Sequence, residues 1–440
     1  MPVKQGVQVL LELIKGGAVK NDGKQNMYVY EPTTGVWEYK KAIQMRRYIA
    51  YFAKEMGIYL TSDEVRKIEK ELLEHIDLFC EQLSWPDDPE WICARNGRVN
   101  LKTLEIKAHD PLKYCTKGLN FKFNKDSKIG YSQAFMRFLE TSLGLKAVVD
   151  AENKYVPKVK LALQILLYCL SNLQGAKKAA VFLGEPHTGK SVLIKFIAQM
   201  VGDTGYAALS LADLGDRFRC SLLENIHLIL SHEMANKGLR NLDILKSIIS
   251  AEPIIIEAKG KQPKNFTPQV KILMGANSLP TLDEIDAGNA FADRLTVLKF
   301  GKSVKERNLH LLEDLYKDRD IIMSLAVKEG PAFIRSKLTF VEDEDGVNAL
   351  KAYKSESNSV ADFLNEQYEV VDDGKAYLRE MYELYEDFSN RNCLHACNQR
   401  SFRQQILQLG YQIKKTRLQQ HENPRACVCN IRKKHGECNV

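Results

Sequence analysis

The stretch AAVFLGEPHTGKSVLIKFIAQMVG (179–202) decides the fold of this 440-residue chain. An apolar run at 179–184 is typical of a buried strand, and apolar residues at helical spacing follow over 191–202. Between them lies the pattern G-x-x-x-x-G-K-[ST], formed by Gly184, Glu185, Pro186, His187, Thr188, Gly189, Lys190 and Ser191. A loop of this type between a strand and a helix wraps phosphates in backbone N–H groups. The stretch therefore predicts a phosphate-binding P-loop in an α/β fold.

Two side chains of this motif supply chemistry that glycines cannot. Lys190 places a cation against the β- and γ-phosphates, and Ser191 offers a hydroxyl ligand to Mg²⁺. The alternative is a chance match in a glycine-containing turn, but the strand before the loop and the helix after it disfavour that alternative. ATP and Mg²⁺ are therefore the expected cofactors, bound by residues 184–191.

Apolar runs that alternate with helical patterns continue beyond the loop. Strand candidates lie at 226–230, 253–258, 270–276 and 294–300. Strands that alternate with helices predict parallel pairing, because a parallel connection needs a long crossover. The region therefore predicts an α/β sheet with the P-loop after one of its strands.

Three polar residues near the expected strands are candidate catalytic groups. Glu233 follows the strand at 226–230, where an acid can serve Mg²⁺ and the attacking water, as in a Walker B motif. Asn277 ends the strand at 270–276 and can orient that water. Arg294 can stabilise charge on the transferring phosphoryl group when a neighbouring subunit supplies it. The plain alternatives are a surface Glu, a turn Asn and a surface Arg.

A basic segment, IIIEAKGKQPKNFTPQ (254–269), lies between two of the expected strands. Its lysines flank a glycine and a proline, a pattern typical of a hairpin tip that could meet nucleic-acid phosphates. A solvated run of charge explains the composition equally well. The candidate DNA-binding residues here are Lys259, Lys261 and Lys264.

The charge of the chain reverses abruptly towards its C-terminal end. The formal net charge is +7 overall, but residues 341–390 carry −10 and residues 391–440 carry +8. A reversal of this kind indicates a basic binding face in the second of these segments. The acidic stretch at 341–347 is the best candidate for a linker before that face.

Helical patterns followed by a basic hairpin predict a winged helix beyond the linker. The helical patterns lie at 357–368, 376–390 and 398–409, and the strand candidates lie at 411–419 and 425–434. Asn398 can cap the third helix, and Gly410 suits its end. In a winged helix this third helix enters the major groove and the wing contacts the backbone. The candidate DNA-binding residues are Arg400, Arg403, Lys414 and Lys415.

The N-terminal third mixes helical patterns with strand-like alternation. Helices are expected at 46–57, 63–83, 132–143 and 156–172, and a hairpin is expected at 96–111. The predicted domains are an α+β N-terminal domain (1–130), a helical collar with the α/β core (131–340), and the acidic linker with the winged helix (341–440).

Taken in order, these motifs resemble the superfamily 3 helicases, an AAA+ class of viral, phage and plasmid replication proteins. Within that class the chain most resembles the poxvirus-type and phage or plasmid primase-helicase family. The segment 94–123 resembles the domain that precedes the helicase in that family, and the region from 358 onward resembles its winged helix. The resemblance of the core rests on 184–191, 211–233, 275–280 and 292–300.

The resemblance implies a ring, often a hexamer, with ATP bound between subunits. It maps the family's pore hairpin onto 257–266, its sensor asparagine onto Asn277 and its arginine finger onto Arg294. One departure is the Walker B motif, where many relatives carry two acids and this chain has His232 before Glu233. A second departure is that no primase or polymerase module has room upstream, so priming would need another protein, or this chain is one piece of a longer ancestor.

The expected function is an ATP-dependent replicative DNA helicase of a phage, plasmid or other mobile element. It would act as a ring that translocates on DNA, with single-stranded and duplex or forked DNA as partners. A P-loop kinase is disfavoured, because a kinase needs neither a winged helix nor a basic tail. An ATP-switched origin-binding initiator without processive unwinding fits the basic tail equally well, but Arg294 together with the basic hairpin favours a motor.

Composition and cysteine spacing disfavour several other classes of protein, namely disordered, membrane-spanning, secreted and zinc-binding ones. Hydrophobic residues make up 45% of the chain and charged residues 27%, a balance typical of folded domains rather than of disorder. No apolar run reaches the roughly 18 residues that span a bilayer, and no signal peptide is evident. A cytoplasmic location, in a bacterial host or at a viral replication site, is therefore expected. The spacing of four potential ligands matches no common zinc framework and favours free thiols over a metal site; these are Cys427, Cys429, His435 and Cys438.

Overall fold

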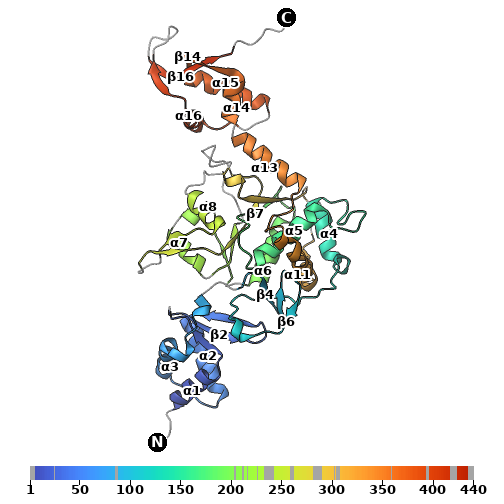
Figure 1. Ribbon diagram of the computed structural model, residues 1–440, viewed down its shortest axis with the longest axis vertical. Coiled ribbons are helices and arrows are strands. Elements are labelled where there is room, and N and C mark those ends of the chain that lie inside the picture. The colour runs from blue at the N-terminus through green and yellow to red at the C-terminus, as the bar shows by residue number, and fades with distance from the viewer. Residues whose placement is uncertain are drawn as a thin grey trace.

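In the computed structural model, the chain folds into three units that lie one after another along the long axis of the molecule (Figure 1). An N-terminal unit lies at one end, the core with the five-stranded sheet lies in the middle, and a C-terminal unit lies at the other end. Among the described residues, no helix is long and apolar enough to cross a membrane. The described residues are 5–23, 25–84, 88–202, 205–210, 213–215, 217–224, 226–231, 242–257, 262–280, 290–301, 303, 308–357, 359–392, 396–416 and 424–434.

The N-terminal unit packs three helices around an antiparallel sheet of order β1-β2-β3. Its elements are α1 (Gln5–Lys15), β1 (Val19–Asn21), β2 (Met27–Glu31), β3 (Val36–Lys40), α2 (Ala42–Glu55) and α3 (Ser62–Glu74). The helix expected at 63–83 ends at Glu74, where a strand side chain bonds to carbonyls at the helix end. Asn21 Nδ2 donates to Leu72 O and to His75 O, both at 3.1 Å. Two short 3₁₀ helices follow, Ile76–Leu78 and Glu81–Ser84.

A small sheet of order β4-β5-β6 follows the N-terminal unit. Its strands are β4 (Trp91–Ala94), β5 (Gly97–Asn100) and β6 (Ile106–Lys107). Strands β5 and β6 form the hairpin expected at 96–111. Ile92 and Val99 are buried in one apolar cluster with the helices of the core. The cluster therefore crosses the domain boundary expected at residue 130.

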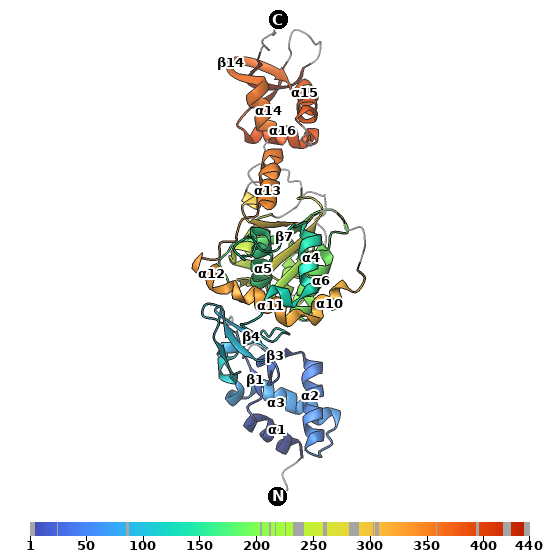
Figure 2. The same cartoon turned by 90° about the vertical axis from the view of Figure 1, so that its right-hand side faces the viewer.

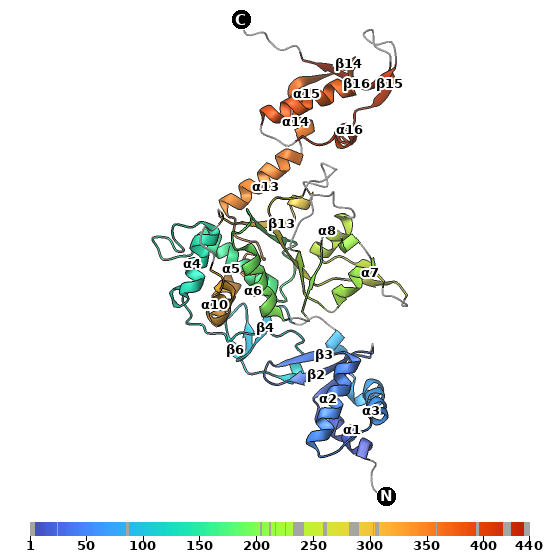
Figure 3. The same ribbon diagram turned by 180° about the vertical axis from the view of Figure 1, so that it is seen from behind.

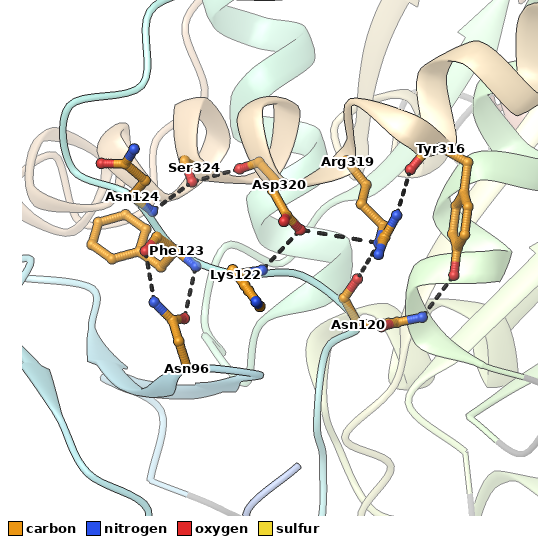
Figure 4. Close-up of polar contacts among 9 residues, drawn as sticks. All are labelled: Asn96, Asn120, Lys122, Phe123, Asn124, Tyr316, Arg319, Asp320 and Ser324. Carbon is orange, nitrogen blue, oxygen red and sulfur yellow. Dashed lines mark hydrogen bonds and ion pairs between the residues drawn. The ribbon is translucent and has the colours of Figure 1, made fainter. Parts of the chain in front are cut away.

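An extended strap, residues 119–124, fastens this small sheet to helices that follow the core sheet (Figure 4). These helices are α10 (Leu311–Lys317) and α11 (Arg319–Lys328). The hydrogen bonds join Lys122 N to Asp320 Oδ1 (2.9 Å), Asn124 N to Ser324 Oγ (2.9 Å), Asn120 Nδ2 to Tyr316 Oη (2.6 Å) and Arg319 Nε to Asn120 O (3.0 Å). On its other side, the strap exchanges two 2.9 Å bonds between Asn96 and the backbone of Phe123. Two segments far apart in sequence, the small sheet and helices α10 and α11, are thus joined through one irregular segment.

The core contains a five-stranded parallel sheet of order β13-β7-β12-β9-β8. Its strands are β7 (Ala179–Leu183), β8 (Tyr206–Ala208), β9 (Leu228–Ser231), β12 (Lys271–Ala276) and β13 (Leu295–Lys299). The parallel α/β sheet is confirmed, with four of its strands where the sequence predicted them. The sequence missed β8, because three residues are too short to show an apolar pattern.

The strand candidate at 253–258 does not join this sheet, which corrects the sequence prediction. Strand β10 (Ile254–Ile256) pairs antiparallel with β11 (Lys264–Phe266) in a separate two-stranded sheet. Three successive isoleucines suggest a strand buried on both faces, but Ile255 is 50% exposed. A short apolar run alone therefore could not distinguish a hairpin strand from a central one.

Helices cover both faces of the five-stranded sheet, as Figures 2 and 3 show from two sides. Along β7, Ala180 and Phe182 lie in the apolar cluster of α5 (Pro157–Leu170) and α6 (Lys190–Val201), whereas Val181 and Leu183 lie in the cluster of α8 (Leu242–Ser250). This alternation produces a three-layer α/β core, since successive strand residues face opposite ways. Further helices of the core are α4 (Gln133–Leu143), α7 (Arg217–Cys220) and α12 (Gly330–Arg335).

The acidic stretch expected as a linker instead begins a helix packed on the core, which corrects that interpretation. Helix α13 (Glu344–Ser357) approaches β13 so closely that a Cβ added to Gly346 would lie 2.2 Å from Val297 O. Lys158 of α5 forms an ion pair with Asp345 in its first turn. Helix α13 then leads from the core to the C-terminal unit (Figure 1).

The C-terminal unit combines three helices with an antiparallel sheet of order β14-β16-β15. Its elements are α14 (Ser359–Gln367), β14 (Tyr368–Tyr377), α15 (Leu378–Arg391), α16 (Gln399–Gln408), β15 (Ile413–Thr416) and β16 (Arg425–Lys433). The three predicted helices and two predicted strands are confirmed, and Asn398 caps α16 by accepting from Ser401 N at 2.9 Å. The sequence missed β14, whose acidic residues show no apolar alternation.

A buried lysine, Lys271, begins the central strand β12. Its Nζ donates to Leu173 O and lies 4.2 Å from the centre of the Tyr168 ring. Burial, reinforced by the charge of Lys117, lowers the pKa of Lys271 to about 7, against the opposing effect of Cys169. The amine therefore gives up its proton much more readily in the folded chain than in the unfolded one.

We expect the free energy of unfolding to rise with pH from about 7 towards 10. In this window the unfolded chain still binds the Lys271 proton, up to an ordinary pKa of 10.5, whereas the folded chain has released it. The contribution is at most about 1.4 kcal/mol per pH unit. Urea unfolding across this window should show a flatter pH dependence for Lys271→Met, whereas the exposed control Lys195→Met should keep the native slope. An unchanged slope in Lys271→Met would contradict the assignment.

Candidate functional site

The P-loop joins β7 to α6 at the carboxyl end of the sheet, where α/β proteins bind ligands. Its first glycine is tied to the next strand, because Gly184 N donates to Ala276 O at 3.1 Å. Its last glycine, Gly189, has a φ of +97°, and an added Cβ would lie 2.5 Å from Ser142 Oγ. Backbone conformation and close contact with α4 therefore both require glycine at position 189.

The middle of the loop is held by a bond within the loop itself. Thr188 is buried, and its Oγ1 donates to Glu185 O at 3.0 Å. His187 adopts the left-handed conformation, with a φ of +63°. Ser191 lies exposed in the first turn of α6, beside Lys190. The eight consecutive residues thus form one compact turn that opens towards the N-terminus of a helix.

Lys190 begins α6, and its ammonium group lies inside this turn. Its Nζ donates to Gly184 O at 2.5 Å, to Glu185 O at 2.6 Å and to Asn277 Oδ1 at 3.1 Å. Burial lowers the pKa of Lys190, and the nearby carboxylate of Glu185 partly offsets that effect. A cation at a helix N-terminus, among backbone N–H groups, is placed to meet phosphate oxygens.

The strand order explains how Asn277 reaches the P-loop. Strand β12 lies directly beside β7, with Ala276 opposite Leu183, so the residue after β12 ends next to the loop. The sequence predicted that Asn277 follows a strand, but no local pattern indicates which strands are neighbours. The structure brings Asn277 and Lys190 together, although 87 positions separate them in the chain.

Of four other predicted site residues, the structure describes one, Lys264. Glu233, Lys259 and Lys261 lie outside the described residues, and β9, the strand before Glu233, runs beside β12. Lys264 lies in β11, where its Nζ is 2.5 Å from Glu224 Oε1. Its charge is therefore partly neutralised within the chain.

Arg294 lies at the opposite end of the sheet from its own P-loop. Its carbonyl accepts a 2.8 Å bond from Ala179 N at the start of β7, whereas the P-loop begins after Leu183. Five strand residues span roughly 16 Å. The guanidinium is half-buried, and Nη1 donates to Ala290 O at 2.9 Å. Within one chain, Arg294 is too distant to contact a phosphate held by Lys190.

An open pocket of about 510 Å³ lies beside the P-loop. The loop and the ends of three strands form part of its lining, and helix α13 forms the rest. Sequence reasoning missed α13, because alanines far downstream carry no chemical signal of a binding site. The lining residues are Leu183, Gly184, Glu185, Asn277, Ser278, Leu279, Lys299, Phe300, Gly301, Ala349, Ala352 and Tyr353.

The other basic residues predicted to bind DNA lie in the C-terminal unit. Helix α16 buries Phe402 and Ile406 and leaves Arg400 and Arg403 exposed on its outer face. The two wing lysines, Lys414 and Lys415, are exposed in β15.

The cysteine pattern near the end of the chain is divided by the limit of the described residues. Cys427 is buried in β16 and Cys429 is half-buried, and both are free thiols. His435 and Cys438 lie outside the described residues. Within the described part of the chain, no group of three or more potential ligands is placed to hold a metal ion.

Comparison with known proteins adds to this geometry. Part of this chain is similar to parvoviral initiator proteins. Initiator protein NS1 of Parvovirus LuIII is 30% identical over 166 residues, and that of Feline panleukopenia virus is 34% identical over 119 residues. These matches cover 35% and 27% of this chain but only 22% and 29% of the relatives. The chain therefore aligns with less than a third of either initiator protein.

Two family models match separate parts of the chain. Residues 14–144 match a family described as D5 N terminal like, and residues 182–294 match a family of unknown function, DUF5906. The first match includes the segment 94–123. The second includes Lys190, Asn277 and Arg294. The resemblance to viral replication proteins is thus confirmed in this general form.

Solved structures show where the whole fold recurs. The A form apo structure of the NrS-1 C terminal region has a TM-score of 0.52, and the apo structure of its residues 305–718 has a TM-score of 0.51. Each match covers 97% of this chain and 100% of the other, at 14% sequence identity. At this identity the likeness concerns the fold alone, and it extends across all three units.

Proposed function

We propose that this chain is an ATP-dependent replicative DNA helicase of a phage, plasmid or other mobile element, with an AAA+ core of the superfamily 3 type. The proposal rests chiefly on the 3.1 Å bond between Lys190 Nζ and Asn277 Oδ1. A phosphate-binding cation and a water-orienting amide at one point support hydrolysis of a nucleoside triphosphate. The similarity to initiator proteins supports placing that hydrolysis in DNA replication.

A ring with shared sites is proposed as well, and the position of Arg294 supports it. This side chain lies far from its own P-loop, and we propose that it acts on a nucleotide held by a neighbouring subunit. Mg²⁺ would be bound by Ser191 and Glu233, and the ring would be a hexamer, as the family resemblance implies. We propose that priming is supplied either by a separate primase or polymerase or by a further part of a longer chain.

The C-terminal unit is proposed to be a winged helix that binds duplex DNA. Its order of helix, strand, two helices and two strands supports this assignment, as does the exposure of Arg400 and Arg403 on α16. The division into an N-terminal domain, a core and a C-terminal domain is proposed as well. On packing grounds, the sheet β4-β5-β6 goes with the core.

Strand displacement on forked DNA tests the proposed function. We expect the full chain to separate the two strands with ATP and Mg²⁺, and to leave them paired with a non-hydrolysable ATP analogue. Unwinding that is equally fast with the analogue, or ATP that is not hydrolysed at all, would contradict the proposal.

One result would favour a second candidate, an ATP-switched origin-binding initiator. Such a protein would bind DNA and hydrolyse ATP but would leave the fork intact. The similarity to NS1 initiator proteins supports this candidate, and the fork assay separates it from the motor.

A further inference from the structure

Helix α13 belongs both to the pocket beside the P-loop and to the connection with the C-terminal unit. Ala349, Ala352 and Tyr353 of this helix line the pocket together with Gly184 and Glu185. The same helix ends at Ser357, and α14 of the C-terminal unit begins at Ser359. Any ligand that fills the pocket therefore touches the element that carries the C-terminal unit.

Three contacts fix α13 against parts of the core that surround the nucleotide chemistry. Gly346 lies against the backbone of β13. Tyr353 Oη donates to Pro280 O at 2.8 Å, in the segment that follows Asn277. Lys354 Nζ lies 2.5 Å from Oδ1 of Asp293, the residue before Arg294. A shift of α13 would thus move the chain segments that carry Asn277 and Arg294, two groups proposed to act in hydrolysis.

The two sides of the pocket offer different chemistry. The P-loop side of the pocket is formed by Gly184 and Glu185, whose carbonyl oxygens accept bonds from Lys190 Nζ. Lys190 begins the helix beyond them, where backbone N–H groups and the ammonium suit phosphates. The α13 side presents two alanine methyl groups and a tyrosine ring whose hydroxyl is already bonded to Pro280 O. Small apolar groups beside a fixed aromatic ring suit a flat heteroaromatic ring, and a volume of about 510 Å³ suits a nucleotide.

We propose that α13 is the nucleobase wall of the site, and that a purine base resting on Ala349, Ala352 and Tyr353 ties the C-terminal unit to nucleotide occupancy. The inference rests on the proposed function, because that function assigns the phosphates to the P-loop. The base wall makes the helix a determinant of specificity, in addition to its role as a connector.

The test compares ATP with inorganic tripolyphosphate, which has the phosphates but no base. Ala352→Trp should weaken ATP binding about tenfold or more, because the indole fills the space of the base, and should leave tripolyphosphate binding unchanged. Lys351→Trp is the matched control, since Lys351 is exposed on the same helix and does not line the pocket. The readout is the ratio of the two affinities, because loss of a positive charge would weaken both ligands alike.

Lys190→Ala separates failure of this inference from failure of the proposed function. It should weaken both ligands; if it weakens neither, the P-loop assignment itself is wrong. If Lys190→Ala weakens both while Ala352→Trp leaves the affinity ratio at the native value, then α13 is not the base wall.

Hydrogen exchange of the native chain tests the coupling. Amides of α13 should exchange more slowly with ATP bound than with tripolyphosphate bound. Equal exchange with the two ligands would overturn the link between the base and the C-terminal unit.

Discussion

Lys190→Ala is expected to lower the rate of ATP hydrolysis about 100- to 1,000-fold and to abolish unwinding of forked DNA. In the native chain, the ammonium lies between the P-loop carbonyls and the amide of Asn277. Its removal leaves the charge that develops on the β- and γ-phosphates without a fixed cation and leaves Asn277 without this partner. Alanine suits the first turn of a helix, so α6 should persist.

The control for this variant is Lys195→Ala, which removes the same charge from an exposed position of the same helix. Steady-state hydrolysis should stay near the native rate in the control, and both variants should melt close to the native temperature. Native turnover in Lys190→Ala would remove the P-loop from the mechanism.

The double substitution Arg400→Ala with Arg403→Ala is expected to weaken binding to duplex DNA and to reduce its salt dependence. Each lost phosphate contact removes about 0.9 from the slope of log affinity against log salt, so the slope should fall by about two. Both side chains lie exposed on the outer face of α16, while Phe402 and Ile406 anchor the opposite face. The fold of the unit should therefore survive the change.

A matched pair on α15 distinguishes specific contacts from net charge. Arg379→Ala with Arg391→Ala removes the same two charges from exposed positions of the C-terminal unit. Affinity measured across a salt series should be near native for this pair. Equal slopes for the two double variants would mean that α16 does not contact DNA. Substitution is preferable to deletion from residue 341, because that deletion would also remove α13 from the pocket.

Features formed by residues that are close together in the sequence could be predicted, whereas contacts between residues far apart in the sequence could not. Strand β7, the P-loop and α6 were predictable because their signals are consecutive, from the apolar run to Lys190. The contact between Lys190 and Asn277 was not, because it depends on β12 lying beside β7. Patterns of apolar spacing identify strands but leave their order in a sheet open.

Two further differences have the same physical origin. The acidic charge of residues 341–347 suggested a linker, but α13, which begins there, packs on the core. The packing is possible because Lys158, far upstream, provides an ionic partner for Asp345. Ala349 and Ala352 gave no sign of a binding surface in the sequence, because their small side chains contribute by leaving room for the pocket. Both features become visible only when segments from distant parts of the chain are placed together.

The strap at 119–124 has a consequence for how the chain is made on the ribosome. Its bonds to Tyr316 and Ser324 span 196 and 200 positions. At synthesis rates of about 5–20 residues per second, the strap waits roughly 10–40 seconds for its partner helices to emerge. During that interval, the apolar cluster that holds Ile92 and Val99 lacks the residues that α10 and α11 contribute to it in the finished protein, among them Leu315 and Ile322. A chain that terminates before α10 would therefore be a fragment prone to self-association and a natural client for chaperones.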